Sequence, residues 1–337
     1  MTFSDRVKYL SKPIWKNKSL LPFNESEFKL QQQLDTEIIY DFESQSNIYS
    51  ISAFYKQLHK LIIWYKTDNS LQINEDEVKK KAYKINGLTL NTYNKELNGP
   101  VDIEVKELTF NALRQIFERP KRYVVGFNSN FYDLPLASYI LASGYHKKTE
   151  DPLLGPQAVR KFSNLLIDPI AYLARGGEEE FGSAIRGNNI DLGNKKRRLS
   201  IWDLDKIYGN SKVNNPDKNT APSLYETFKR LNNTGLHLDM KRLNESDKDL
   251  DSRYTSLKRI SAQLGYQIEE PESVDLSSNK GLTNEQAVNL LAYNASDVLV
   301  TTLIFGTKTY QNVLSTREGL LNRFDESNFK GRLNVNS

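Results

Sequence analysis

The stretch Glu37-Ile-Ile-Tyr-Asp-Phe-Glu43 decides the fold of this chain. Its isoleucine, tyrosine and phenylalanine residues favour a β-strand, in which alternate side chains point to opposite faces of a sheet. One face would then be wholly apolar, while the other would carry Ile39 together with Asp41 and Glu43. Apolar residues on both faces are typical of a central strand. Carboxylates there are costly unless they are paired or bind a metal ion.

The residues around this stretch predict an α/β fold. Thr283 and Gln286 have the spacing of a capping box, so a helix should begin there. Residues 145–200 contain glycine-rich and charged runs and are expected to be insertions. Runs of β-forming residues predict strands over 37–43, 47–55, 60–66, 101–105, 123–126 and 199–204. Apolar spacing predicts helices over 107–118, 134–144, 223–231, 246–264 and 283–305.

Composition sets loose limits on function. A chain of 337 residues that is 38% hydrophobic can bury a core, and its net charge of +4 permits a polyanionic partner without requiring one. Without cysteine it has no disulfides and no thiolate metal ligands. The N-terminal residues lack the apolar segment of a secretory signal, and the most apolar run, Leu61–Tyr65, is too short to span a bilayer. We therefore expect a cytoplasmic protein with no membrane partner.

The pattern Asp-x-Glu is by itself a weak signal, because it occurs three times, beginning at Asp35, Asp41 and Asp102. The third has a simple structural explanation. Alternate valine and isoleucine residues would face the core and leave Asp102 and Glu104 in water. The second lies on the strand that is apolar on both faces, so a functional role and a chance occurrence both remain open for it.

Two further sites carry acidic residues in informative settings. Asp133 follows the strand over 123–126 and precedes a helix, a common place for functional side chains, although an aspartate can equally cap such a helix. Tyr293 and Asp297 are four residues apart on the last helix and share a face. That helix is apolar on two sides, which indicates that it is sandwiched. Asp297 should then lie among buried neighbours, with a salt bridge to lysine or arginine as the alternative.

Taken in order, the three segments resemble the exonuclease motifs of the DEDD superfamily. They are Asp41-Phe-Glu43, Asn128-x-x-x-Tyr132-Asp133 and Tyr293-x-x-x-Asp297. The tyrosine in the third marks the DEDDy branch, and the set is similar to the proofreading exonuclease of phage-type family B DNA polymerases. Two further segments, Trp202–Asp205 and Pro222–Phe228, resemble the strand and helix that lie between the second and third motifs of that family.

This resemblance spans residues 36–306 and implies a ribonuclease H-like fold. Its mixed β-sheet would be flanked by helices, with insertions between the second and third motifs. Residues 1–35 would form an N-terminal extension, and residues 307–337 a C-terminal tail, which the resemblance connects to a polymerase region or partner.

The resemblance also implies a mechanism with two Mg²⁺ or Mn²⁺ ions about 4 Å apart. Asp41 would contact both ions. Glu43 and Asp297 would serve the ion that activates water, and Asp133 would support the other ion through water. Tyr293 would position the attacking water, because a phenol with its usual pKa near 10 is a poor base. A 5′-mononucleotide would leave from the 3′ end of single-stranded DNA.

Substrate contacts follow from the same comparison. Asn128 would contact the terminal nucleotide, and Phe131 or Phe127 would stack on a base. The basic run Lys195–Arg198 could grip phosphates, but it equally fits a solvated loop. Three other aspartates are interpreted as structural, namely Asp168, Asp203 and Asp205.

Other functions are compatible with these residues. An RNA-trimming DEDD nuclease would use the same carboxylates, and a nuclease-like fold could serve as a nucleic-acid-binding subunit of a polymerase without turnover. A DNA polymerase, as a separate subunit or as a continuation of the chain, is the expected protein partner. If the chain is of phage origin, the expected location is the host cytoplasm.

Overall fold

The structure is a computed structural model. It describes residues 37–82, 97, 99–118, 123–146, 152–169, 199–210, 222–233, 237–244, 256–266 and 280–325. The expected extension over 1–35, the Lys195–Arg198 run and most of the helix expected over 246–264 lie outside these described residues.

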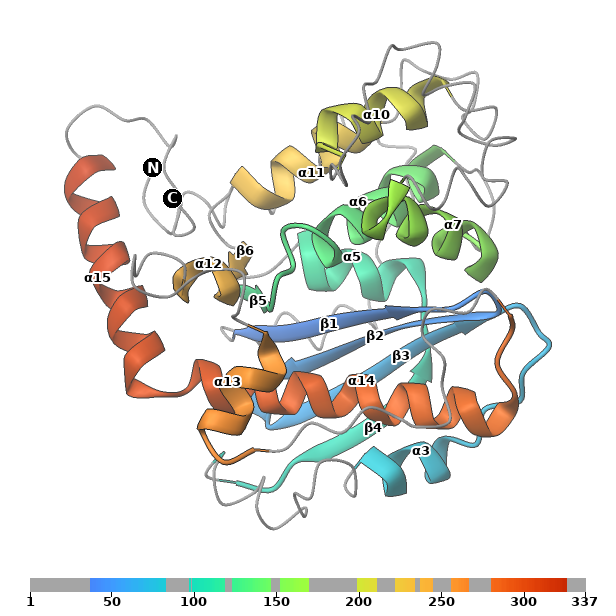
Figure 1. Cartoon of the computed structure of the whole chain (residues 1–337), viewed down its shortest axis with the longest axis horizontal. Coiled ribbons are helices and arrows are strands. Elements are labelled where there is room, and N and C mark those ends of the chain that lie inside the picture. Colours follow the sequence, from blue (N-terminus) through green and yellow to red (C-terminus); the bar gives the residue numbers. More distant parts are fainter. Residues whose placement is uncertain are drawn as a thin grey trace.

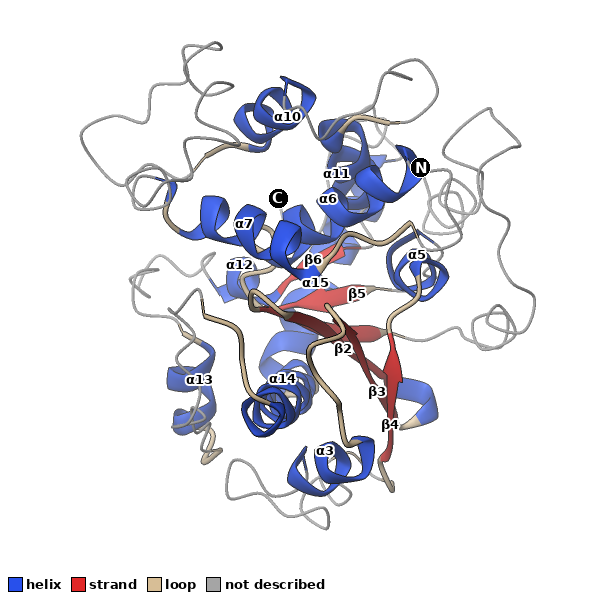
Figure 2. Ribbon diagram, turned by 90° about the vertical axis from the view of Figure 1, so that its right-hand side faces the viewer, coloured by secondary structure: helices blue, strands red, loops and turns tan. Residues whose placement is uncertain are grey.

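A mixed six-stranded sheet forms the centre of the molecule, in the order β4-β3-β2-β1-β5-β6 (Figures 1 and 2). The first three strands form an antiparallel meander. The other three each run parallel to their neighbour: β4 to β3, β5 to β1 and β6 to β5. The strands are β1 (Ile38–Ser44), β2 (Ile48–Tyr55), β3 (Lys60–Thr67), β4 (Asp102–Glu107), β5 (Val124–Gly126) and β6 (His237–Asp239).

Helices cover both faces of this sheet, as Figure 2 shows. One face carries α5 (Phe110–Glu118), α6 (Asp133–His146) and α7 (Pro156–Ile167), with α10 (Ile201–Asn210) and α11 (Leu224–Asn233) beyond them. The other face carries α3 (Glu75–Ala82), α13 (Leu257–Gln263) and α14 (Asn284–Phe305). The short helix α12 (Met240–Asn244) follows β6, and α15 (Lys308–Asp325) follows α14. The predicted α/β class with a mixed, helix-flanked sheet is confirmed.

Alternation along β1 divides the hydrophobic core in two. Tyr40 and Phe42 pack in the core beneath α5, where Tyr40 meets Phe117 edge to face at a centroid distance of 4.9 Å. Ile39 belongs to the second core, together with the apolar residues of α14. Because the pleat has a period of two, Asp41 and Glu43 share the face of Ile39 and lie toward α14. The sheet thus directs both carboxylates to one helix.

Helix α14 is sandwiched, as its two apolar sides predicted. It begins at the expected capping box, in which Thr283 and Gln286 each bond to the backbone of the other. It is long and apolar enough to span a membrane, but 94% of its apolar window is buried inside the protein. That burial identifies it as a core helix between the sheet and α3.

The strand predicted over 199–204 is wrong, because this stretch enters helix α10. Ser200 and Asp203 form a reciprocal cap: the Asp203 amide donates to Ser200 Oγ at 3.2 Å, and the Ser200 amide donates to Asp203 Oδ2 at 3.1 Å. Such a cap starts a helix whatever the strand propensity of Ile201 and Trp202. The place beside β5 is taken instead by β6, whose three residues have no recognisable period.

Besides α10, four α-helices of the described residues were not predicted, and the short α12 after β6 is one of them. Helix α7 lies within residues 145–200 and packs against β1 and β2, and α15 lies within residues 307–337. Helix α3 packs against α14, although only Val78 and Ala82 of it are buried. Its sequence is mostly charged, so the apolar period that would reveal it is short.

Candidate metal centre

Three carboxylates from distant parts of the chain meet between β1 and α14. One oxygen from each of Asp41, Glu43 and Asp297 lies within 4.8 Å of the others. Asp297 is 6% exposed, while Asp41 and Glu43 are half-buried. This is the group of oxygen ligands that the sequence predicted, except for Asp133.

Asn294 holds one of these carboxylates in place. Its Nδ2 donates a hydrogen bond of 2.7 Å to Asp41 Oδ2, and its own Oδ1 accepts one of 3.4 Å from Ser50 Oγ on β2. The side chain is fully buried. Sequence analysis missed this residue, because its role depends on which face of the helix packs against β1, and the sequence alone does not give that packing.

Asp133 lies beside the three carboxylates but outside their close group. It is the first residue of α6, it is 3% exposed, and its Oδ1 accepts a hydrogen bond of 3.2 Å from the amide of Phe42, between Asp41 and Glu43. It lines the same pocket as those two residues. Asp133 therefore lies beside Asp41 and Glu43 along the edge of β1, beyond the residues that pair with β5.

The charges in this group oppose one another. Burial raises the pKa of Asp41 well above its ordinary value, and the charges of Asp133, Glu43 and Asp297 raise it further, against the hydrogen bond from Asn294. Desolvation of this kind favours the neutral acid. A buried set of carboxylates that repel one another is stabilised by a bound cation.

Two cations near Glu43 do not cancel this effect. Burial raises the pKa of Glu43 to about 8, and the charge of Asp297 adds to it, whereas Arg160 and Lys258 act in the opposite direction. The net shift stays upward. The charges of Arg160 and Lys258 thus lower the pKa of Glu43 less than burial and the charge of Asp297 raise it.

Tyr293 remains a neutral phenol in this setting. The residue is 6% exposed, and burial raises its pKa above the ordinary value, with further increases from Asp297, Glu43 and a hydrogen bond with Asp297. The expected pairing of Tyr293 and Asp297 along one face of the helix is thus present. A protonated hydroxyl can orient a water molecule but cannot act as a base.

The pocket beside these acids has a volume of about 350 Å³. Asn128, Phe127 and Phe131 line it, together with Asp41 and Glu43. Phe131 is 41% exposed, and the guanidinium carbon of Arg242 lies 5.1 Å from the centre of its ring. The residues expected to contact a substrate therefore share one cavity with Asp41, Glu43 and Asp133, whereas Asp297 does not line it.

Asp239 orders the loop that carries these substrate candidates. It is fully buried at the end of β6 and accepts hydrogen bonds from the amides of Asn128 at 2.9 Å, Asn130 at 3.1 Å and Lys241 at 3.0 Å. Asn128 has a left-handed backbone with φ of 59°. Sequence analysis missed Asp239, since the strand on which it stands has only three residues.

Helix α7 closes another side of the pocket. Arg160 Nη1 donates a hydrogen bond of 2.8 Å to the carbonyl of Ser44, at the end of β1. The hydroxyl of Tyr132 lies 3.1 Å from Ser44 Oγ and 2.8 Å from Ser163 Oγ on the helix. These bonds tie α7 to the strand that carries Asp41 and Glu43.

Of the three aspartates interpreted as structural, Asp203 and Asp205 have side chains that bond to the backbone at helix ends, as expected. Asp168 is the C-cap residue of α7, Asp203 caps α10, and Asp205 Oδ1 accepts a hydrogen bond of 2.8 Å from the amide of Tyr225 in α11. On β4, Asp102 and Glu104 both form ion pairs with Lys60. The core-facing side of that strand is apolar, as predicted.

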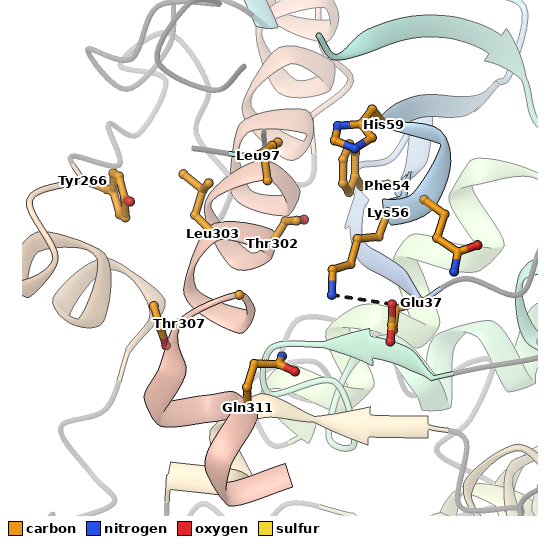
Figure 3. A pocket seen from close by; sticks show the side chains of 12 residues that line it. Glu37, Phe54, Lys56, His59, Leu97, Tyr266, Thr302, Leu303, Thr307 and Gln311 are labelled. Atoms are coloured by element: carbon orange, nitrogen blue, oxygen red, sulfur yellow. Dashed lines mark ion pairs between the residues drawn. The ribbon is translucent and has the colours of Figure 1, made fainter. Parts of the chain in front are cut away.

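A larger cavity, of about 650 Å³, lies where β1 begins rather than where the acids gather (Figure 3). Its described lining comes mainly from the end of β2, the β2–β3 turn and the junction of α14 with α15, and its single carboxylate is that of Glu37, just before β1. Lys56 Nζ forms an ion pair with Glu37 at 3.6 Å. Size alone would favour this cavity, but the grouped acids favour the smaller pocket as the chemical site.

No protein-family model, curated protein or solved structure matches this chain.

Proposed function

We propose that the chain is a metal-dependent 3′–5′ exonuclease that removes 5′-mononucleotides from single-stranded or frayed DNA 3′ ends. One observation carries the proposal. Carboxylates of Asp41 and Asp297, which are 256 positions apart in sequence, come together with that of Glu43 within 4.8 Å. Proofreading in DNA replication, in the cytoplasm and with a polymerase subunit or region as partner, is the role proposed for this activity.

The sheet supports a ribonuclease H-like fold for the domain. An antiparallel meander of β1, β2 and β3 is followed by two strands, β5 and β6, that add in parallel on the other side of β1. The first acids then lie on the central strand, next to a helix that returns from the far end of the sequence. In this interpretation β4 is an additional edge strand.

The residues fit a pair of hard divalent cations. Asp41, Glu43 and Asp297 offer carboxylate oxygens, which suit Mg²⁺ and Mn²⁺, and their crowding calls for positive charge. Asp133 would supply a further oxygen on the other side of Asp41. Two such ions, held by these carboxylates, would activate a water molecule and stabilise charge on the oxygens of a phosphodiester.

Two groups next to the acids hold the reacting partners in position and do not transfer protons. The neutral Tyr293 hydroxyl orients the attacking water toward the scissile phosphate. The hydrogen bond from Asn294 fixes the carboxylate of Asp41, so that its geometry does not have to reorganise during the reaction.

The pocket favours a terminal nucleotide over a paired duplex. Its volume of about 350 Å³ is near the lower limit for small-molecule sites. Phe131 presents an exposed ring for stacking on a base, and Asn128 offers an amide close by.

A single assay tests this proposal. Single-stranded DNA labelled at its 5′ end should shorten one nucleotide at a time in Mg²⁺ or Mn²⁺, and a chelator should stop the reaction. Asp297→Ala should abolish cleavage, whereas Asp102→Ala, which removes an acid on the edge strand β4, should leave it unchanged.

A matched RNA oligonucleotide separates the alternatives. Equal or faster RNA shortening would replace the DNA assignment with RNA trimming. Binding of DNA without any shortening in either metal would indicate a non-catalytic subunit and overturn the proposed activity.

A further inference from the structure

Helix α10 carries a tryptophan that the acidic pocket does not use. Trp202 is 54% exposed, and Phe131 and Ile167, two other large apolar residues with exposed side chains, line the acidic pocket. A single exposed aromatic residue is common on protein surfaces, so Trp202 is informative only together with its neighbours. Trp202 belongs neither to the group of carboxylates nor to the described lining of the acidic pocket.

A second aromatic ring stacks on the indole of Trp202 and fixes its orientation. Trp202 stacks on Tyr225 of α11 with a centroid distance of 3.8 Å and an interplanar angle of 24°. Tyr225 is half-buried, so it supports the indole from the side of the protein. Because more than half of Trp202 remains open to solvent, the pair presents a rigid aromatic surface.

Each aromatic residue has a lysine one helical turn further along. Lys206 follows Trp202 by four positions on α10, and Lys229 follows Tyr225 by four positions on α11, so each pair shares a helix face. Both lysines are exposed, and Lys229 Nζ lies 5.8 Å from the centre of the Tyr225 ring. Among the described residues neither lysine takes part in an ion pair.

The carboxylates nearby are engaged with helix ends. Asp203 Oδ2 accepts from the amide of Ser200 at 3.1 Å, Asp205 Oδ1 from the amide of Tyr225 at 2.8 Å and Glu226 Oε2 from the amide of Ser223 at 3.0 Å. Their charge is thus directed at the positive ends of α10 and α11. The two lysines remain available to an external anion.

We propose that Trp202, Tyr225, Lys206 and Lys229 form a second binding site for single-stranded nucleic acid, outside the acidic pocket. A base stacks on the open face of Trp202, and the adjoining phosphates contact the two lysines. Stacking on an aromatic ring tolerates any base, so the site holds a strand without reading its sequence. It goes beyond the proposed exonuclease and requires neither its metal ions nor its turnover.

Fluorescence of Trp202 tests the stacking directly. Titration with a 16-nucleotide oligothymidylate in a chelator, which stops any cleavage, should quench the fluorescence of the wild-type protein. Trp202→Ala should lose the quenching and bind the labelled oligonucleotide about tenfold more weakly by anisotropy, as expected for one lost stacking contact. Trp202→Phe should lose the quenching but keep its affinity within about threefold, because phenylalanine also stacks.

Salt dependence tests the lysines without changing the aromatic pair. The double variant Lys206→Ala, Lys229→Ala should reduce the slope of log affinity against log salt by about 1.4, or 0.7 for each lost phosphate contact on a single strand. Leu264→Ala, which removes an exposed apolar side chain near α13, should change neither quenching nor affinity.

The proposal is overturned if Trp202→Ala binds the oligonucleotide as tightly as the wild type, or if the double lysine variant keeps the wild-type salt slope. Thermal melting followed by circular dichroism identifies a variant that fails to fold. If Trp202→Ala is such a variant, the lysine pair and Trp202→Phe decide the matter. Because all binding is measured without metal, an inactive nuclease that still binds through Trp202 would refute the proposed function alone.

Discussion

Two strands of one sheet carry the same Asp-x-Glu pattern with opposite results. The pair that begins at Asp41 lies on the central strand and faces α14, where Asp297 adds a third carboxylate. The pair that begins at Asp102 lies on the edge strand, where Lys60 forms ion pairs with both acids. The residues next to each pair, on α14 in one case and on β3 in the other, therefore decide whether paired acids form a ligand group or an ion-pair network.

The largest expected difference between the two pairs is in catalysis. Asp41→Asn removes an anionic ligand from the site and should lower the rate of DNA shortening about a thousandfold, equivalent to several kcal/mol of transition-state stabilisation. Asp102→Asn, the same substitution on the edge strand, should leave the rate within about twofold. Single-turnover rates with saturating protein measure both, and comparable losses in the two variants would contradict the assignment.

The two glutamates should also differ in how pH affects stability. The pKa of Glu43 in the folded protein, about 8, lies above its ordinary value of 4.5. The folded state then binds this proton more tightly, so the stability that Glu43 contributes is fully present below its ordinary pKa and is lost as pH rises toward about 8.

Glu43→Gln removes the loss of stability that ionisation of Glu43 causes at high pH. In a chelator at pH 8 to 9, this variant should be more stable than the wild type by an amount on the order of 1 kcal/mol or more. Denaturant unfolding at several pH values measures it. A variant that is less stable than the wild type at high pH would show that Glu43 is satisfied without a metal ion.

Asn294 offers a smaller test of the central pair. Asn294→Ala removes the hydrogen bond to Asp41 and should raise the Mn²⁺ concentration needed for half-maximal activity about tenfold, as for other groups that orient metal ligands. Asn289→Ala, which changes an asparagine of the same helix that bonds to Lys81, serves as the matched control. Equal metal dependence in both variants would remove Asn294 from the site.

The smallest effect is expected on the edge strand. Burial acts to raise the pKa of Glu104, but hydrogen bonds and charges from Lys106 and Lys60 outweigh it and lower the pKa. Its stabilising effect is therefore present above the ordinary pKa and fades as pH falls below it. Glu104→Gln should destabilise the protein by less than about 1 kcal/mol at pH 7 because the pair is screened by water. A thermal melt in low and high salt measures this.

Elements with a strong apolar period could be predicted from the sequence. An element decided by competition between a helix cap and strand propensity could not. The alternation in β1 placed Asp41 and Glu43 on the face of Ile39, and the two apolar sides of α14 predicted its burial. The strand predicted over 199–204 is wrong because the helix cap formed by Ser200 and Asp203 outweighs the strand propensity of this stretch.

The missed site residues depend on tertiary contacts. Asn294 and Asp239 each bond to a partner more than 100 positions away, and such pairs leave no trace in a single sequence. The position of Asp133, beside the three carboxylates rather than among them, likewise depends on its hydrogen bond to the amide of Phe42.

Binding of Mn²⁺ in solution tests the central claim most directly. Electron paramagnetic resonance counts free Mn²⁺ while the ion is added to the wild-type protein, to Asp41→Asn and to Asp102→Asn. We predict saturable binding that Asp102→Asn retains and Asp41→Asn loses. Identical binding curves for wild type and Asp41→Asn would contradict a metal centre at Asp41, Glu43 and Asp297.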